Sequence, residues 1–247
     1  KNVNIFRKQY PRFLYKGYSF AYQRGELKIS FDFSVPPDIE FHPTVVIKNV
    51  SKKDLDKIGE NVLNNLIFHL GLMEIPSYWK TTCSPEIVVE AGYLNKDQIR
   101  WWKDLIIKGM GEYFYKNKID FTKPGFLKIS STQSLPKPVP KPGLGPRPKP
   151  GLGNRVMVPV GGGKDAVVTL ELLKKAGMPL RPFLLNPKPE QKKILSVARV
   201  QKPIVVERTV DPKLLELNRK GYLNGHTPFS AYLAFLSVFA AILFDYK

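Results

Sequence analysis

The sequence is poor in cysteine and histidine, and each shortage excludes a class of protein. A single cysteine, Cys83, excludes an intrachain disulfide framework and suits a reducing cytoplasm. His42 and His69 show no spacing with each other or with Cys83 that is typical of a metal cluster. The first residues are basic, but no apolar stretch with a small-residue cleavage site follows them, so we expect no signal peptide.

Long hydrophobic runs are also scarce. The segment Phe229–Phe244 carries no charge, but it is shorter than the roughly 20 residues that a membrane-spanning helix needs. Thr227 as N-cap and Pro228 at the first helical position predict that a helix starts there. We therefore expect a buried core helix and no membrane span.

Basic residues, in contrast, are plentiful. The 39 Lys and Arg residues exceed the 21 Asp and Glu residues and give a formal net charge of +18. This excess favours polyanionic ligands such as nucleic acid, a nucleotide, a UDP-sugar or an acidic membrane. The hydrophobic fraction of 43% is ordinary for a globular protein, and 247 residues can bury one large core or two modest ones.

The N-terminal part has the patterns of an α+β domain. Alternating residues over Tyr18–Tyr22 and Leu27–Phe33 predict a hairpin, and Thr44–Ile47 predicts a third strand. One helix is predicted over Ser51–Leu70 and a second over Asn95–Phe114. Each begins with a capping residue that is followed three positions later by Asp or Gln.

The composition changes sharply between residues 133 and 154. Proline recurs at every second position over most of Pro136–Pro150, and the motif KPGLG occurs twice. These features are typical of a solvated polyproline II segment, which serves either as a linker or as a ligand for an SH3-type domain. We interpret it as a linker between a domain at 1–132 and another at 155–247.

Strands and helices alternate after this linker. The expected strands are 156–160, 180–185 and 204–210, and the expected helices are 164–176, 189–199, 211–220 and 228–245. This order predicts an α/β domain with a parallel sheet and a ligand site at the carboxyl ends of its strands. Because a further strand should follow the last helix, we expect this domain to be incomplete.

A glycine turn lies at the end of the first of these strands. Gly161, Gly162 and Gly163 are followed by Lys164 and Asp165 and then by an amphipathic helix. Glycine lets backbone N–H groups approach an anion closely, and a helix N-terminus favours negative charge. We predict a phosphate site there. A glycine-rich turn without a ligand is the alternative.

The spacing of this turn narrows the kind of phosphate site. It matches neither GxxxxGK[ST] nor GxGxxG, but it resembles the SGGxDS loop of PP-loop ATP pyrophosphatases. Gly162, Gly163 and Asp165 match that loop, whereas Gly161 and Ala166 replace its two serines. The resemblance implies that residues 161–165 bind the phosphates of ATP, with Asp165 also near a metal ion. Asn186, just after the second strand, would lie where such enzymes bind the base.

Two other segments are dense in reactive groups: Ser77–Glu86 (SYWKTTCSPE), expected to be irregular, and Asn224–Ser230 (NGHTPFS). Together with GGGKDA, the runs Phe68–Glu86 and Arg208–Ser237 resemble the UDP-N-acetylmuramoyl-L-alanyl-L-glutamate epimerases, the MurL family. The resemblance covers most of residues 17–129 and 155–247. It implies inversion of the terminal L-glutamate of a UDP-muramoyl dipeptide in peptidoglycan synthesis, with ATP and Mg²⁺.

Under this resemblance, His226, Cys83 and Lys80 are the candidates for the proton-transfer pair, and Asn224 is a candidate donor to the substrate carboxylate. Simpler interpretations also exist, because a single cysteine is often a small buried hydrophobe and His226 can be a turn residue. Two other functions remain open: a PP-loop enzyme that adenylates tRNA, which the positive charge favours, and a non-catalytic interaction protein, which Ala166 favours.

Overall fold

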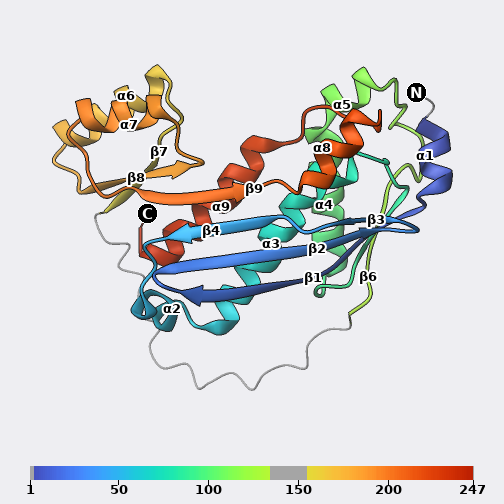
Figure 1. Cartoon of the computed structure of the whole chain (residues 1–247), viewed down its shortest axis with the longest axis horizontal. Coiled ribbons are helices and arrows are strands. Elements are labelled where there is room, and N and C mark those ends of the chain that lie inside the picture. The colour runs from blue at the N-terminus through green and yellow to red at the C-terminus, as the bar shows by residue number, and fades with distance from the viewer. Residues whose placement is uncertain (1–2, 134–154, 247) are drawn as a thin grey trace.

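A computed structural model describes residues 3–133 and 155–246, and the strands in these ranges form one mixed sheet (Figure 1). Nine strands are found there, in the order β6-β5-β1-β2-β4-β9-β8-β7, with β3 paired to β2. The strands are β1 (Arg12–Gln23), β2 (Glu26–Val35), β3 (Ile39–Phe41), β4 (Thr44–Lys48), β5 (Glu86–Val89), β6 (Lys128–Ser131), β7 (Val156–Pro159), β8 (Leu180–Leu185) and β9 (Ile204–Thr209). The helices are α1 (Val3–Gln9), α2 (Lys52–Ile58), α3 (Glu60–Trp79), α4 (Lys96–Gly109), α5 (Gly111–Lys116), α6 (Lys164–Lys175), α7 (Pro189–Val197), α8 (Pro212–Arg219) and α9 (Phe229–Phe244). The chain is thus an α/β protein, and its proposed linker lies, except for Gln133, outside the described residues.

The predicted hairpin and third strand are confirmed. Strands β1 and β2 pair antiparallel around a turn at Arg24 and Gly25, and β4 pairs antiparallel with β2. Alternate residues of β2 are buried, whereas the residues between them are at least partly accessible. The buried residues are Leu27, Ile29, Phe31, Phe33 and Val35. This side of the sheet therefore carries the core, and α3, α4 and α9 lie behind it in Figure 1.

The two helices predicted in the N-terminal part are each interrupted, so those predictions were wrong in part. Their capping boxes are present as expected, at Ser51 and Asn95. Gly59, with φ of 74°, then separates α2 from α3, and Met110, with φ of −113°, separates α4 from α5. Helix α3 also continues to Trp79, so the start of the segment expected to be irregular is helical.

The C-terminal strands are parallel, as predicted. Strand β8 pairs parallel with β7 on one side and with β9 on the other. Its side chains alternate between two cores: Leu184 packs in a small core with Leu170 of α6 and Leu195 of α7. Phe183 belongs to the main core, which includes residues of α9. Helices therefore cover both faces of β8, which is the arrangement that a parallel sheet requires.

Strand β9 joins the two parts of the chain. It pairs parallel with β8 and antiparallel with β4, with Thr44 opposite Thr209. The main core accordingly contains residues from both sides of the segment 133–154. That segment does not divide the described strands into two sheets, although the division into domains and the incompleteness of the second one stay predictions.

One face of the apolar helix α9 packs on the core, whereas Phe229, Val238 and Ile242 are exposed, so the expectation of a buried core helix is confirmed only in part. Helix α9 begins at Phe229 with Pro228 as its N-cap residue, so the predicted start, with Thr227 as the cap, was wrong by one residue. Pro228, with φ of −70° and ψ of 65°, is outside the helical region and cannot be the first helical residue. The helix packs against α3 and α2. Across residues 3–133 and 155–246 no helix has the length and apolarity to cross a membrane.

Gly71 lets α3 pack closely against the sheet, and this contact can be tested. A Cβ at Gly71 would overlap the hydroxyl and ring of Tyr15 and would lie 2.9 Å from Cδ1 of Phe31. We expect Gly71→Ala to lower the free energy of unfolding by about 1–3 kcal/mol in urea denaturation, because the buried rings must shift. Gly111→Ala is the control, since no described atom lies within 4 Å of its added Cβ. Equal effects of the two variants would contradict this account.

Candidate functional site

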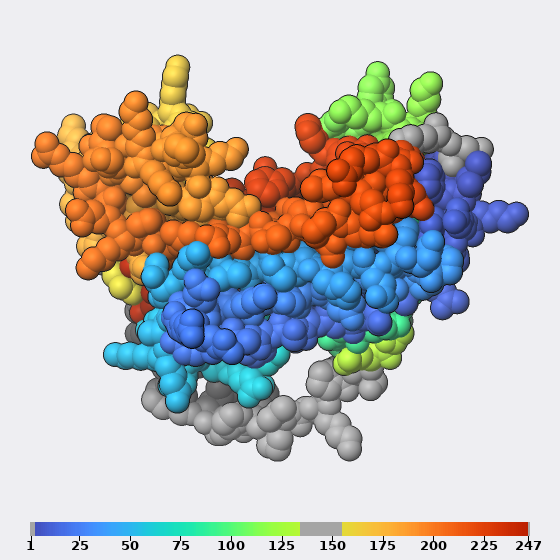
Figure 2. Space-filling model, viewed as in Figure 1, coloured from blue at the N-terminus to red at the C-terminus, as the bar shows by residue number. Residues whose placement is uncertain are grey.

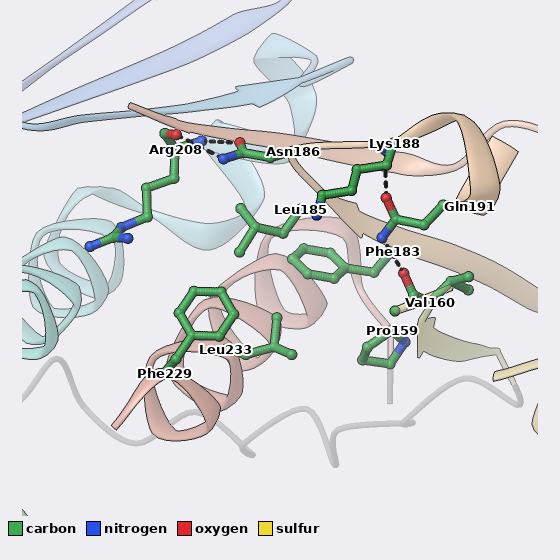
Figure 3. Close-up of a pocket in the computed structure, with 11 residues that line it drawn as sticks. Pro159, Val160, Phe183, Leu185, Asn186, Lys188, Gln191, Arg208, Phe229 and Leu233 are labelled. Carbon is green, nitrogen blue, oxygen red and sulfur yellow. Dashed lines mark hydrogen bonds between the residues drawn. The ribbon is translucent and has the colours of Figure 1, made fainter. Parts of the chain in front are cut away.

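A hollow lies at the carboxyl ends of the parallel strands. Figure 2 shows it between the lobe of α6 and α7 and the lobe of α5 and α8. A pocket of about 330 Å³ opens there, and Figure 3 shows its lining. The lining residues come from the ends of the three strands, the α7 region and α9: Pro159, Val160, Gly161, Phe183, Leu185, Asn186, Lys188, Gln191, Arg208, Phe229 and Leu233. The predicted position of a ligand at this edge of the sheet therefore coincides with a real cavity.

Gly161, the first residue of the glycine turn, lines one end of this pocket. Gly162 has φ of 88°, which favours glycine, and Gly163 is the N-cap residue of α6. No side chain among the described residues caps this helix end, and no described atom lies within 4 Å of a Cβ added at Gly161 or Gly163. The first N–H groups of α6 are therefore available to an anion at the position where the helix dipole favours negative charge.

Gln191 holds the turn in place, although the sequence analysis did not select it. Its amide donates a hydrogen bond of 2.7 Å to the carbonyl of Val160, and its oxygen accepts one of 2.6 Å from the N–H of Lys188. Gln191 is buried, and both bonds are visible in Figure 3. This side chain links the end of β7 to the start of α7 across the floor of the pocket.

Asn186 lines the pocket as predicted, but its amide already has partners. Its oxygen accepts a 2.7 Å hydrogen bond from the N–H of Arg208, and its nitrogen donates one of 2.9 Å to the carbonyl of Arg208. Asn186 also has a left-handed backbone, with φ of 46°. In this structure the side chain joins the ends of β8 and β9. A contact with a nucleotide base stays a prediction.

Arg208 connects the pocket to helix α3. Its Nε and Nη2 donate to the two carboxylate oxygens of Glu74 at 2.7 and 2.5 Å, and Nη2 also donates to Ser77 at 3.0 Å. Glu74 is fully buried, and the guanidinium lies over the ring of Tyr232 at 4.6 Å. A charged pair of this kind places a fixed guanidinium at the pocket wall. Neither residue was among those predicted from the sequence, although the one acidic residue within the apolar run LGLMEIP, Glu74, was a usable signal.

Lys80 and the segment after α8 form a second cluster beside Arg208. The ammonium of Lys80 donates a 3.1 Å hydrogen bond to the carbonyl of Gly225. Burial and the charge of Arg208 lower the pKa of Lys80. His226 pairs through Nδ1 with Glu112 of α5, and its side chain is 86% exposed. The hydrogen bond of Lys80 to Gly225 therefore places its ammonium next to the backbone of the loop that carries His226, whereas neither side chain lines the pocket.

Two other predicted residues are placed differently. Asn224 lies beside Gly225, where its side-chain oxygen accepts a 2.9 Å hydrogen bond from the N–H of Gly225. Cys83 is fully buried, and Arg7 donates a 2.7 Å hydrogen bond to its carbonyl. Burial raises the pKa of the Cys83 thiol. A thiol with these properties is a poor proton acceptor near neutral pH, which disfavours Cys83 as a catalytic group.

The described residues contain no group of three or more His, Cys, Asp or Glu side chains that could hold a metal ion. Lys164 and Asp165 lie exposed in the first turn of α6, beside the glycine turn. A divalent ion there would have Asp165 as its protein ligand, with phosphate oxygens and water completing its shell. Mg²⁺ commonly binds in this way.

The pairing of Glu74 with Arg208 gives a prediction about stability. We expect Glu74→Ala to lower the free energy of unfolding by about 3–5 kcal/mol, because it leaves the mostly buried guanidinium without its partner. The double variant Glu74→Met with Arg208→Met is expected to lower the free energy of unfolding much less, because it leaves no buried charge without a partner. Glu207→Ala is the control, since it removes the partly exposed ion pair between Glu207 of β9 and Lys48 of β4 and should lower the free energy of unfolding by at most about 1 kcal/mol. Urea denaturation measures all of these variants, and a double variant as unstable as Glu74→Ala would refute the expectation.

The family model and the relatives that match this chain all indicate the same family. A family model described as the MurL N-terminal domain matches residues 5–247. A relative from Salinispora tropica, named UDP-N-acetyl-alpha-D-muramoyl-L-alanyl-L-glutamate epimerase, is 29% identical over 94% of this chain and 48% of its own length. Relatives with the same name are 27% identical in a Micromonospora species, over 94% of this chain and 49% of the relative, and 28% identical in Xanthomonas oryzae, over 68% and 35%.

The chain thus spans about half the length of the Salinispora and Micromonospora relatives. No solved structure gives a significant match. Because the family model extends over nearly all of the sequence, from the first helix to the last, the chain belongs to the MurL N-terminal domain family.

Proposed function

We propose that this chain takes part in the epimerisation of the terminal glutamate of UDP-N-acetylmuramoyl-L-alanyl-L-glutamate, in peptidoglycan precursor synthesis. Membership of the MurL N-terminal domain family and the shared name of its relatives support this proposal. The observation that carries it is a single cavity that extends from the glycine turn to Arg208 and Phe229. Such a cavity can hold a nucleotide phosphate at one end and an acceptor group at the other.

ATP is the nucleotide that we propose for this pocket. Gly161, Gly162 and Gly163 would present backbone N–H groups to its phosphates, and Lys164 would add a positive charge. The accessible turn and the uncapped start of α6 support this assignment. Mg²⁺ would be held by Asp165 and by phosphate oxygens. The two serines of the SGGxDS loop are replaced here, so the backbone would supply most of the phosphate contacts.

The inversion explains why ATP would be needed. A free carboxylate makes the neighbouring C–H very hard to ionise, because the carbanion would form next to a negative charge. Attack of the substrate carboxylate on the α-phosphorus of ATP releases pyrophosphate and gives an acyl-adenylate, whose carbonyl is neutral. Removal of the α-proton on one face and its return on the other inverts the centre, and hydrolysis then releases AMP. A base, an acid and hydrogen-bond donors to the enolate oxygen are required for this chemistry.

His226 is the residue that we favour for proton transfer. It lies on the loop that leads into α9, three residues before Phe229 of the pocket, and Glu112 can orient its ring. Lys80 is close to this loop and is kept nearer to neutrality than an ordinary lysine, since burial lowers its pKa. Asn224 remains a candidate donor to a substrate carboxylate. The burial of Cys83 makes that thiol the weakest of the candidates.

The glycine turn offers a matched test of nucleotide binding. Gly162→Ala places a side chain at φ of 88° in the turn, next to the pocket residue Gly161, whereas Gly177→Ala does so at φ of 67° at the other end of α6. Both variants carry a similar backbone strain of about 1–2 kcal/mol. We expect only Gly162→Ala to weaken ATP binding, by about tenfold, because it changes the direction of the N–H groups. ATP–pyrophosphate exchange, measured with and without the UDP-muramoyl dipeptide, should fall in the same way.

Two results would contradict the nucleotide site: equal effects of the Gly162 and Gly177 variants, or no ATP binding by the unaltered chain. Exchange that depends on tRNA in place of the dipeptide would favour a tRNA-modifying enzyme. Binding of ATP without any exchange would favour a non-catalytic role.

The role of His226 can be separated from adenylation. We expect His226→Ala to leave AMP formation largely intact and to slow incorporation of solvent deuterium at the glutamate α-carbon by about 100-fold or more. His42→Ala, on the loop between β3 and β4, is the control and should change neither rate. Loss of both activities together in His226→Ala would count against a role restricted to proton transfer.

A further inference from the structure

Arg208 lines the end of the pocket remote from the glycine turn, and its guanidinium contacts Glu74 and Ser77 of α3, whose C-cap residue is Lys80. The buried carboxylate of Glu74 neutralises Arg208. Lys80 follows Ser77, which Arg208 also contacts, by three residues in helical conformation, so its side chain starts from the same face of α3. The lowered pKa of Lys80, caused by burial and by the charge of Arg208, agrees with this placement. No ion pair of Lys80 is found in residues 3–133 and 155–246. The cluster of Lys80, Arg208 and Glu74 therefore has two cations for one anion.

Both cations have hydrogen-bond donors to spare. Glu74 and Ser77 occupy Nε and Nη2 of Arg208, and no described residue accepts a hydrogen bond from Nη1. Lys80 uses one of its three donors for the carbonyl of Gly225. Arg208 lines the pocket, and Figure 3 shows its side chain extending beyond Asn186 and Leu185. The unused donors thus come from a residue of the pocket wall and from its cationic neighbour.

This arrangement is costly without a ligand. A partly buried ammonium beside a guanidinium loses hydration and is repelled by its neighbour. The hydrogen bond from Lys80 to the carbonyl of Gly225 does not require a positive charge on Lys80, because a neutral donor could make the same bond. A bound anion would restore neutrality and use the remaining donors. Groups destabilised in this way are concentrated at functional sites.

We propose that Lys80 and Arg208 together bind the side-chain carboxylate of the substrate's terminal glutamate. This assignment rests on the proposed function, because the α-carboxylate must be activated to acidify the α-C–H bond. The γ-carboxylate then keeps its charge throughout the reaction and is the group that a fixed cationic site can hold. The cluster would place the glutamate relative to the glycine turn at the opposite end of the pocket.

Calorimetric titration with two ligands tests the proposal. One is UDP-N-acetylmuramoyl-L-alanyl-L-glutamate, and the other is the analogue that ends in L-glutamine, which lacks only the γ-charge. We expect the unaltered chain to prefer the glutamate ligand, and Lys80→Met to reduce this preference by about tenfold. Arg208→Lys, which keeps a charge opposite Glu74, should reduce the same preference. Arg219→Met removes an exposed charge from the last turn of α8 and is the control, with the preference unchanged.

A second measurement separates this role from a structural one. If Lys80 binds a ligand, Lys80→Met removes an uncompensated charge, and the Tm of the free protein should stay the same or rise. If Lys80 only supports the loop at Gly225, the Tm should fall and the ligand preference should persist, which would overturn the proposal. Loss of affinity for both ligands equally in Lys80→Met would also overturn it, since it would indicate a site for the phosphates of UDP.

Failure of the proposed function would give a different result from failure of the carboxylate site. If the unaltered chain binds neither ligand, the UDP-muramoyl dipeptide is the wrong substrate, and glutarate then serves as a simple carboxylate probe. A rise in Tm with glutarate for the unaltered chain, absent in Lys80→Met, would support the carboxylate site alone. The lack of any such rise would refute the site as well.

Discussion

The buried ion pair between Glu74 and Arg208 determines how the two parts of the chain form one site. Glu74 belongs to α3 in the N-terminal part, whereas Arg208 lies near the carboxyl end of β9, one of the three parallel strands. A buried carboxylate without its partner is strongly disfavoured, so α3 and β9 must keep this geometry in the folded state. The same contact places the guanidinium at the pocket wall. Stability and the shape of the pocket thus depend on one interaction.

Much of the local structure could be predicted from the sequence, because the signals were local. The strand, turn and helix around Gly161–Gly163 follow from an apolar run, three glycines and a helical period, and the observed bounds of β7 and α6 agree within one residue. The break at Gly59 was missed because the apolar period continues across it. Strands β5 and β6 were also missed, and they pair in parallel with strands that are distant in the sequence, β1 and β5 respectively. The pairing of β4 with β9 is a long-range contact that no local pattern contains.

In the candidate site, too, the features with a local sequence signal could be predicted and those that depend on long-range contacts could not. The glycine turn and its first helical turn could be recognised because one continuous segment forms them. Arg208 could not, because its importance arises from a carboxylate 134 positions earlier in the chain. Gln191 likewise gains its role from the carbonyl of Val160, 31 positions away. Of the predicted proton-transfer residues, Lys80 contacts the loop that carries His226, whereas Cys83 is fully buried beside Arg7.

The pairing of β4 with β9 has a consequence for the order of events during folding. The hairpin of β1 and β2, together with β4, can form as soon as the first fifty or so residues have left the ribosome, since these contacts are close in sequence. Strand β4 then has an unpaired edge until Ile204–Thr209 has been synthesised. Exposed strand edges promote aggregation. The nascent chain is therefore most vulnerable to self-association while the residues between β4 and β9 are being translated, which is the interval in which a chaperone would be of most use.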